Sequence, residues 1–229
     1  MQSSYDLLYA LKVMEYLQTT RDPFWWPHSG SVEVIIGAIL TQQTKWEKVE
    51  LSLEHLHAHD LCTLKALSTT NLSVIAKLIQ PSGFYNTKAQ RLQRLCQNIL
   101  KDFGDFETFA QEVDREWLLS QKGIGMESAD SILCYACKRD VMVIDSYTQR
   151  LLEALGYAFE SYMQIQEWMQ EGIESNWEKV QQLYDHPVTL QTVYARFHGK
   201  IVEFAKKHIK GKKVDTTQLE ALMEKGKEI

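Results

Sequence analysis

Hydrophobic residues recur along most of the chain at intervals of three and four positions, which is the spacing of one buried helix face. The pattern is clear in residues 7–17 and from about residue 85 to 102, whereas residues 32–43 are almost wholly apolar, as in a fully buried helix. No segment alternates long enough to predict a strand, and the apolar stretch 141–144 is too short to assign. The sequence therefore predicts an all-α protein.

The composition is that of an ordinary globular protein. The chain has 229 residues, 45% hydrophobic and 24% charged, which is enough for one large domain or two small ones. Charged residues interrupt the apolar positions near the N-terminus, so we expect no signal peptide. The longest apolar run, residues 34–40, is too short to cross a bilayer, so we expect no membrane partner. Four cysteines are few for this length and fit reduced thiols in a cytoplasm.

The charge is distributed unevenly along the chain. The net charge is −5, yet residues 196–213 hold seven basic residues and one acidic residue, and residues 88–101 hold four basic residues and no acidic one. Basic segments on an acidic body favour local binding of a phosphate backbone, although lysine-rich helices are as often merely solvated. We interpret residues 196–213 as a basic helix in which Lys206 and Lys207 contact phosphates.

A turn with two glycines lies between two predicted helices. Residues 118–130 read LLSQKGIGMESAD, with Gly123 and Gly125 two positions apart. Glycine permits a positive φ and close approach by a neighbour, and unpaired N–H groups at a helix start can bind a phosphate. The spacing alone is weak, because a tight turn between helices explains it as well. The candidate phosphate contacts here are Lys122, Gly123, Gly125 and Ser128.

Further motifs occur in the order and spacing of one protein family. Residues 39–44 read ILTQQT, residues 83–89 read GFYNTKA, residues 143–147 read VIDSY, and residues 198–200 read HGK. Together with the glycine turn, they resemble the endonuclease III-like, helix-hairpin-helix DNA glycosylases over about residues 32–200. This resemblance implies a DNA-repair enzyme that binds double-stranded damaged DNA. In a bacterium it would be a cytoplasmic protein associated with the nucleoid.

The resemblance identifies Asp145 as the catalytic carboxylate. Breaking an N-glycosidic bond develops oxocarbenium character on the deoxyribose, and a nearby carboxylate stabilises that charge or orients the attacking water. The structural alternative is that Asp145 only caps a helix that begins at Ser146. The two roles are compatible.

Two departures from the family pattern narrow the chemistry. Bifunctional members carry a lysine after the hairpin that attacks C1′, and the matching residue here is Glu127, which cannot form an imine. The resemblance therefore implies a monofunctional glycosylase that uses water. No cysteine follows the HGK motif, where endonuclease III holds an iron–sulfur cluster. Cys134 and Cys137 fit small buried residues, so we expect no metal and no cofactor.

Aromatic residues indicate which base is removed. Residues 22–27 read DPFWWP, and the five aromatic or proline rings in a row fit either a plug between helical lobes or a pocket for an extrahelical base. Alkylated purines carry positive charge, which aromatic faces attract. The chain looks most similar to the 3-methyladenine branch of the family. That similarity implies that Gln43 fills the gap left in the duplex, and that the base pocket is lined by Trp25, Trp26, Pro27 and Trp46.

The resemblance also implies a two-lobed, all-α fold with the active site in the cleft between the lobes. We expect residues 31–145 to form a helical-barrel lobe that carries the hairpin. Residues 1–30 and 146–229 would form the second lobe, and the protein would be a monomer. The alternatives are a bifunctional glycosylase and lyase for oxidised pyrimidines, a mismatch-specific enzyme, a non-catalytic DNA-binding protein and a helical scaffold. Glu127 disfavours the first of these.

Overall fold

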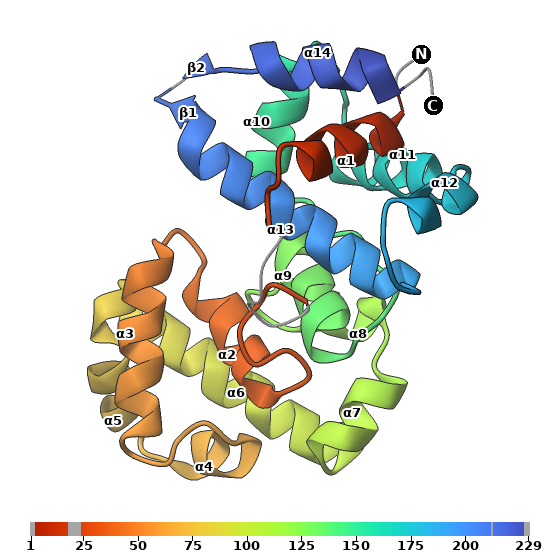
Figure 1. Cartoon of the computed structure of the whole chain (residues 1–229). Coiled ribbons are helices and arrows are strands. Elements are labelled where there is room, and N and C mark those ends of the chain that lie inside the picture. Colours follow the sequence, from red (N-terminus) through yellow and green to blue (C-terminus); the bar gives the residue numbers. More distant parts are fainter. Residues whose placement is uncertain (1–2, 18–23, 212, 227–229) are drawn as a thin grey trace. The chain divides into compact units, whose positions relative to one another are not determined.

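The computed structural model describes residues 3–17, 24–211 and 213–226 (Figure 1). Asp22, Pro23 and Lys212, which belong to segments considered above, lie outside the described residues. The chain divides into two compact units, which we call the internal unit (His28–Arg139) and the terminal unit (Met1–Pro27 with Asp140–Ile229). Helices dominate both units, so the prediction of an all-α protein is confirmed. Within the described ranges, no helix is long and apolar enough to cross a membrane.

The internal unit is assembled around one long helix. Its elements are α2 (Val32–Leu40), α3 (Trp46–His57), α4 (Leu64–Thr69), α5 (Leu72–Leu78), η1 (Gln80–Ser82), α6 (Tyr85–Phe103), α7 (Phe106–Glu112), α8 (Arg115–Ser120), α9 (Met126–Ser131) and η2 (Ile132–Ala136). Helix α6 packs against α2, α4, α5 and α7. Leu92, Leu95 and Ile99 are buried at its centre, because their spacing places them on one face.

Helix α9 continues directly into a π-helical turn, η2. The N–H of Cys137 donates to the carbonyl of Ile132, five residues earlier, at 3.0 Å. Such turns are rare in proteins overall, and those that occur are often found at functional sites. This one immediately follows the glycine hairpin formed by α8 and α9.

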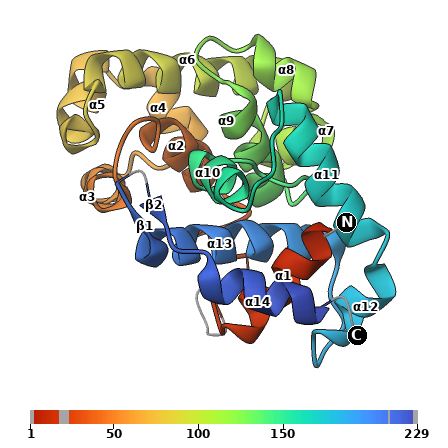
Figure 2. The ribbon, with the colours of Figure 1, turned by 90° about the horizontal axis from the view of Figure 1, so that it is seen from above.

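The terminal unit brings the two ends of the chain together. Its elements are α1 (Ser4–Val13), α10 (Ser146–Ala154), α11 (Tyr162–Glu174), α12 (Trp177–Gln182), α13 (Leu190–His208), β1 (Ile209–Lys210), β2 (Lys213–Val214) and α14 (Thr217–Gly226). In Figures 1 and 2, α1 lies beside α13 and α14, and it contacts both. Residues 142–144 are buried, belong to neither a helix nor a strand, and lead directly into Asp145.

The interpretation of residues 196–213 as one basic helix is wrong in two respects. Helix α13 ends at His208, and Lys210 and Lys213 pair with each other in a two-residue antiparallel ladder. Lys200 is only 2% exposed and its Nζ donates to the carbonyl of Tyr16. Burial lowers the pKa of Lys200 to about 7. Lys200 points inward because the apolar face of α13 includes its position, so it adds nothing to a basic surface.

One lysine of the basic segment 88–101 is also buried. Lys88 is 2% exposed, and its ammonium donates to the carbonyls of Leu40 and Ser82 and to the Thr44 hydroxyl, at 2.7–2.9 Å. Burial lowers its pKa to about 8. Lys88 therefore ties the end of α2 to the turn before α6, and it is not available as a phosphate contact.

Candidate active site

Asp145 caps helix α10 with its side chain. One carboxylate oxygen, Oδ1, accepts hydrogen bonds from the Thr148 backbone N–H at 2.7 Å and from the Thr148 hydroxyl at 2.8 Å. The residue is only 9% exposed. The capping role considered in the sequence analysis is therefore real. It fixes the carboxylate at the positive end of a helix, where the helix dipole favours a negative charge.

The other carboxylate oxygen faces a buried histidine. His198 Nε2 lies 3.6 Å from Asp145 Oδ2, and the His198 side chain is 5% exposed. Burial by itself would raise the pKa of Asp145, but interaction with the His198 imidazole and the two hydrogen bonds from Thr148 outweigh it and lower the pKa. The site thus holds a carboxylate that is both buried and ionised at neutral pH.

Trp25 contacts this histidine with its ring. The two rings meet edge to face, with centroids 5.3 Å apart and planes at 86°, and the Trp25 indole N–H donates to Glu203 Oε1 at 3.3 Å. Trp26 is 7% exposed and stands perpendicular to Trp25, with ring centroids 6.3 Å apart. Pro27 is half-buried. Of the predicted pocket residues, Trp25 is therefore one side chain away from Asp145 through His198.

The geometry gives each letter of the HGK motif a physical reason. His198 faces Asp145, and Lys200 holds the carbonyl of Tyr16. A Cβ on Gly199 would overlap the Trp25 ring, so only glycine lets this tryptophan lie flat against α13. The motif thus packs Trp25 against the histidine that faces the Asp145 carboxylate.

The glycine hairpin lies in the internal unit and differs at its two glycines. Gly123 has φ +90°, and a Cβ there would overlap the Arg91 side chain. Gly125 has φ −99°, which any residue adopts, so the positive φ that glycine permits is used in this turn at Gly123 and not at Gly125. A Cβ on Gly125 meets nothing within 4 Å, and the residue is exposed. No neighbour in the described part of the chain requires a glycine at this position.

A polar network braces the loop before α3 against this hairpin. Gln42 Nε2 donates to the Gly123 carbonyl at 2.9 Å and to the Ser128 hydroxyl at 3.1 Å. Arg91 donates to Gln42 Oε1 at 2.9 Å. Gln43, next in the loop, is exposed and has φ +55°, an unfavourable conformation for a non-glycine residue. The network braces the loop that carries Gln43, and the Gln43 side chain itself is exposed.

The remaining predicted site residues have varied environments. Lys122 and Glu127 are exposed on the hairpin, and Trp46 is half-buried at the first position of α3. Lys206 pairs with Glu203 at 3.0 Å, and Lys207 lies over the Tyr16 ring with its Nζ 5.0 Å from the centroid. Trp46 and the hairpin belong to the internal unit, whereas Asp145, Trp25, Lys206 and Lys207 belong to the terminal unit.

Sequence reasoning missed several residues that build these sites. Thr148 stands at the capping distance from Asp145, a signal that was available in the sequence. The roles of Glu203, Gln42 and Arg91 depend on contacts between distant segments, which no local pattern shows. Cys134 and Cys137 are buried as predicted, and burial raises the pKa of Cys137 to about 12.

Comparison with known proteins identifies the family of this chain. The family model "HhH-GPD superfamily base excision DNA repair protein" matches residues 36–175. The chain is 35% identical over 195 residues to the putative DNA repair glycosylase MJ1434 of Methanocaldococcus jannaschii, covering 82% of each chain. The chain therefore belongs to the HhH-GPD superfamily of base excision DNA repair proteins. The family resemblance drawn from the sequence motifs is confirmed.

Solved structures extend this comparison. The H. pylori 3-methyladenine DNA glycosylase MagIII, solved with bound 1,N6-ethenoadenine, is 46% identical and superposes with a TM-score of 0.87. The match covers 91% of this chain and 99% of that chain. An endonuclease III–DNA complex is 19% identical with a TM-score of 0.70, covering 100% and 98% of the two chains, and shows the shared fold.

Proposed function

We propose that this protein is a monofunctional DNA glycosylase that releases alkylated purines of the 3-methyladenine type from double-stranded DNA during base excision repair. The observation that carries the proposal is the buried carboxylate of Asp145, kept ionised by His198 and Thr148. The relative at 46% identity is named for 3-methyladenine and was solved with another modified purine, which supports the choice of base.

The chemistry follows from the charge on Asp145. As the N-glycosidic bond breaks, positive charge develops on the deoxyribose, and an ionised carboxylate in a water-poor site stabilises it strongly. An alkylated purine already carries positive charge and leaves readily, so the site needs no general acid. Water then attacks C1′, oriented by the same carboxylate. His198 acts as a positioning residue that keeps Asp145 charged.

The proposed base pocket comprises Trp25, Trp26, Pro27 and Trp46. Indole faces attract cationic rings by about 0.5–2 kcal/mol, which favours an alkylated purine over its neutral parent. The hydrogen bond from Trp25 to Glu203 fixes the orientation of the first ring. A pocket built this way selects by charge and stacking, with few base-edge hydrogen bonds.

The proposed DNA contacts are mostly made by backbone and small side chains. On the hairpin they comprise Lys122, Gly123, Gly125 and Ser128, and open space around Gly125 supports close approach by a phosphate. Gln43 enters the duplex in place of the extruded nucleotide. Lys206 and Lys207 on α13 contribute charge. We further propose that the protein acts as a monomer in the cytoplasm, at the nucleoid in a bacterial host.

The residue at the lyase position supports hydrolysis without strand cleavage. Glu127 is exposed in the first turn of α9, and a carboxylate cannot form the imine that β-elimination requires. The bifunctional alternative would need another amine to attack C1′.

Product analysis tests the proposal. DNA treated with a methylating agent is incubated with the wild-type protein and with Asp145→Asn, and released bases are separated by chromatography. We expect 3-methyladenine from the wild type alone, with strands that break only after alkali. Cleavage without alkali would favour the bifunctional alternative. Equal release by Asp145→Asn would show that Asp145 is not catalytic, and release of no alkylated base would overturn the assigned substrate class.

A further inference from the structure

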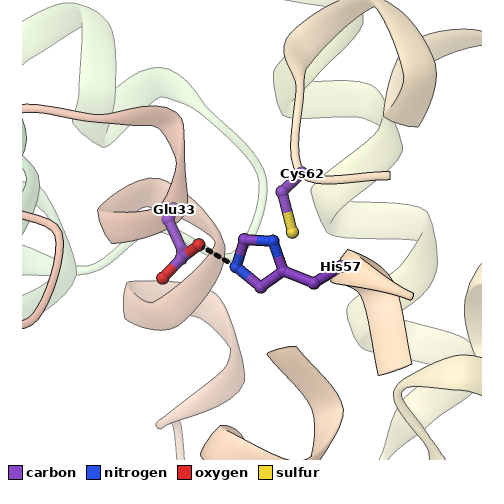
Figure 3. Close-up of side chains that lie close together, drawn as sticks. All are labelled: Glu33, His57 and Cys62. Atoms are coloured by element: carbon purple, nitrogen blue, oxygen red, sulfur yellow. Dashed lines mark ion pairs between the residues drawn. The ribbon is translucent and has the colours of Figure 1, made fainter. Parts of the chain in front are cut away.

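A cluster of three different ligand types lies in the internal unit, away from the residues assigned so far. Glu33 is in the first turn of α2, His57 is the last residue of α3, and Cys62 follows in the loop before α4. One carboxylate oxygen, one imidazole nitrogen and the sulfur all lie within 4.8 Å of one another. Figure 3 shows the imidazole between the carboxylate and the thiol, with both groups turned toward it.

We propose that Glu33, His57 and Cys62 bind a divalent transition-metal ion of the Zn²⁺ class. Zinc sites in proteins combine thiolate, imidazole and carboxylate donors, at about 2.0–2.3 Å from the metal. Glu33 comes from α2, His57 and Cys62 come from the end of α3 and the loop after it, and one ligand atom of each lies close to the other two. The His57 side chain is half-exposed, so it can rotate toward an ion bound between the three.

A fourth donor stands beside the three. His28 Nε2 lies 3.2 Å from Glu33 Oε1, and its ring centroid is 6.2 Å from that of His57. The His28 side chain is 64% exposed, so it can rotate toward a bound ion without disturbing the core. Four protein ligands make the closed, tetrahedral arrangement of a structural zinc site.

The charge at Glu33 supports a cation here. Glu33 is only 8% exposed, and its ion pairs within the described part of the chain are with His28 and His57. Imidazoles carry positive charge only when protonated, whereas a buried carboxylate needs a constant compensating charge. A divalent ion supplies that charge regardless of the state of either histidine.

Binding exchanges a proton for the metal at the thiol. Zinc binds cysteine as the thiolate, so binding replaces the thiol proton of the free cysteine Cys62 with the metal. The ion forms a bond to sulfur and the thiol proton passes to solvent. The thiolate and the Glu33 carboxylate together balance both charges of the ion, which leaves a neutral complex. No oxidant or reductant takes part.

The proposed ion would add Cys62 to the link that the Glu33–His57 ion pair already makes between α2 and α3. It would connect the start of α2, the end of α3 and the turn at residues 58–62. This departs from the sequence-based expectation of a protein without metal. No local spacing marks this site, because Glu33 is far from the other two ligands and no Cys-x-x-Cys or His-x-x-x-His pair occurs among them.

Cobalt titration tests the site directly. Full-length protein is freed of metal with a chelator and titrated with Co²⁺, which absorbs visibly where Zn²⁺ does not. We expect a thiolate-to-cobalt charge-transfer band with the visible bands of a tetrahedral ion, both removed stoichiometrically by Zn²⁺. We also expect Zn²⁺ to raise the thermal midpoint relative to protein in chelator.

Variants separate this site from adventitious binding. Cys62→Ser should abolish the charge-transfer band, and His57→Gln should weaken Zn²⁺ binding beyond the roughly 10–100-fold that loss of an outer-shell partner costs. His59→Ala, an exposed histidine two residues from His57, is the matched control and should bind as the wild type does. Circular dichroism of each variant in chelator confirms that it is folded.

Three results would overturn the proposal. These are no charge-transfer band in the wild type, a band that survives Cys62→Ser, and a loss in His59→Ala equal to that in His57→Gln. His28→Ala distinguishes a four-ligand site, which it weakens, from a three-ligand site completed by water, which it leaves unchanged. Neither of those two results affects the assignment of the other three ligands.

Discussion

The hairpin of the internal unit and the carboxylate centre of the terminal unit contribute to one proposed reaction with opposite kinds of structure. At the hairpin, the informative feature is the absence of a side chain at Gly125. This residue has an ordinary φ and open space around it, so no described neighbour explains why it lacks a Cβ. At the centre, Asp145, His198 and Trp25 are each engaged with another side chain of the same unit.

This difference indicates how each region should respond to substitution. A surface that presents backbone N–H groups needs only room, and it is maintained by the neighbours that hold the loop, such as Arg91 and Gln42. A buried charge needs partners on every side, so each residue around Asp145 affects both stability and chemistry. A substitution at Gly125 should therefore change DNA binding without changing stability, whereas loss of a partner of Asp145 should change both stability and chemistry.

The largest expected effect is at Asp145. Asp145→Asn keeps a good N-cap for α10 but removes the charge, so we expect base release to fall by at least about 100-fold with little change in stability. Asp145→Ala should lose the same activity and also about 1 kcal/mol of stability, because the cap is gone. Single-turnover release and urea unfolding measure the two effects. An active Asp145→Asn would reduce Asp145 to a structural cap.

The next effect is on DNA affinity at the hairpin. Gly125→Ala should weaken DNA binding by about tenfold or more, because one hydrogen bond to a charged group contributes about 1.5–3 kcal/mol. The free energy of unfolding should change by no more than about 0.5 kcal/mol. Gly123→Ala should instead destabilise the protein, through its positive φ and the overlap with Arg91. Gly104→Ala, with φ +84° but open space, is the control for backbone strain alone. Unchanged DNA binding in Gly125→Ala would remove the hairpin from the interface.

A smaller effect is expected in the pH dependence. His198 lowers the pKa of Asp145, so His198→Gln should raise that pKa and move the acid limb of the pH–rate profile to higher pH. A carboxyl group whose pKa is lowered on folding stabilises the fold above its unfolded pKa, and this contribution is lost as pH falls through the folded value. Acid unfolding of His198→Gln should therefore begin at higher pH than in the wild type. An unmoved acid limb would show that His198 does not act through Asp145.

The smallest effect is expected from the exposed lysines of α13. Lys207→Ala should reduce the slope of log affinity against log salt by about 1, and Lys206→Ala by less, because Glu203 already compensates its charge. Lys65→Ala, an exposed lysine of the internal unit, serves as the control. Equal slopes in all three variants would exclude this part of α13 as a DNA contact.

The helices were the most predictable part of this protein. The three- and four-residue spacing predicts a helix at about residues 85–102, and α6 spans Tyr85–Phe103, because burial of one face both creates the pattern and stabilises the helix. The glycine hairpin and the position of Asp145 were also predictable, since a tight turn and a helix cap each need particular residue types nearby in sequence.

Charge was the least predictable feature. Counting lysines and arginines treats every one as exposed, yet Lys88 and Lys200 are buried and bind backbone carbonyls. The signal for Lys200 was present, because it lies three residues after the buried Phe197 and four before the buried Phe204, on the same helix face. The hydrogen bond between Trp25 and Glu203 joins residues 178 positions apart, and no local pattern contains such a contact.

One consequence follows from Asp145 being the end of a helix as well as the proposed reacting group. The first turn of a helix frays in fluctuations that cost far less free energy than opening the whole domain. Each such fluctuation releases Thr148 from the carboxylate and moves the charge away from the sugar. On warming, we therefore expect turnover to pass its maximum and begin to fall below the temperature at which the compact structure is lost.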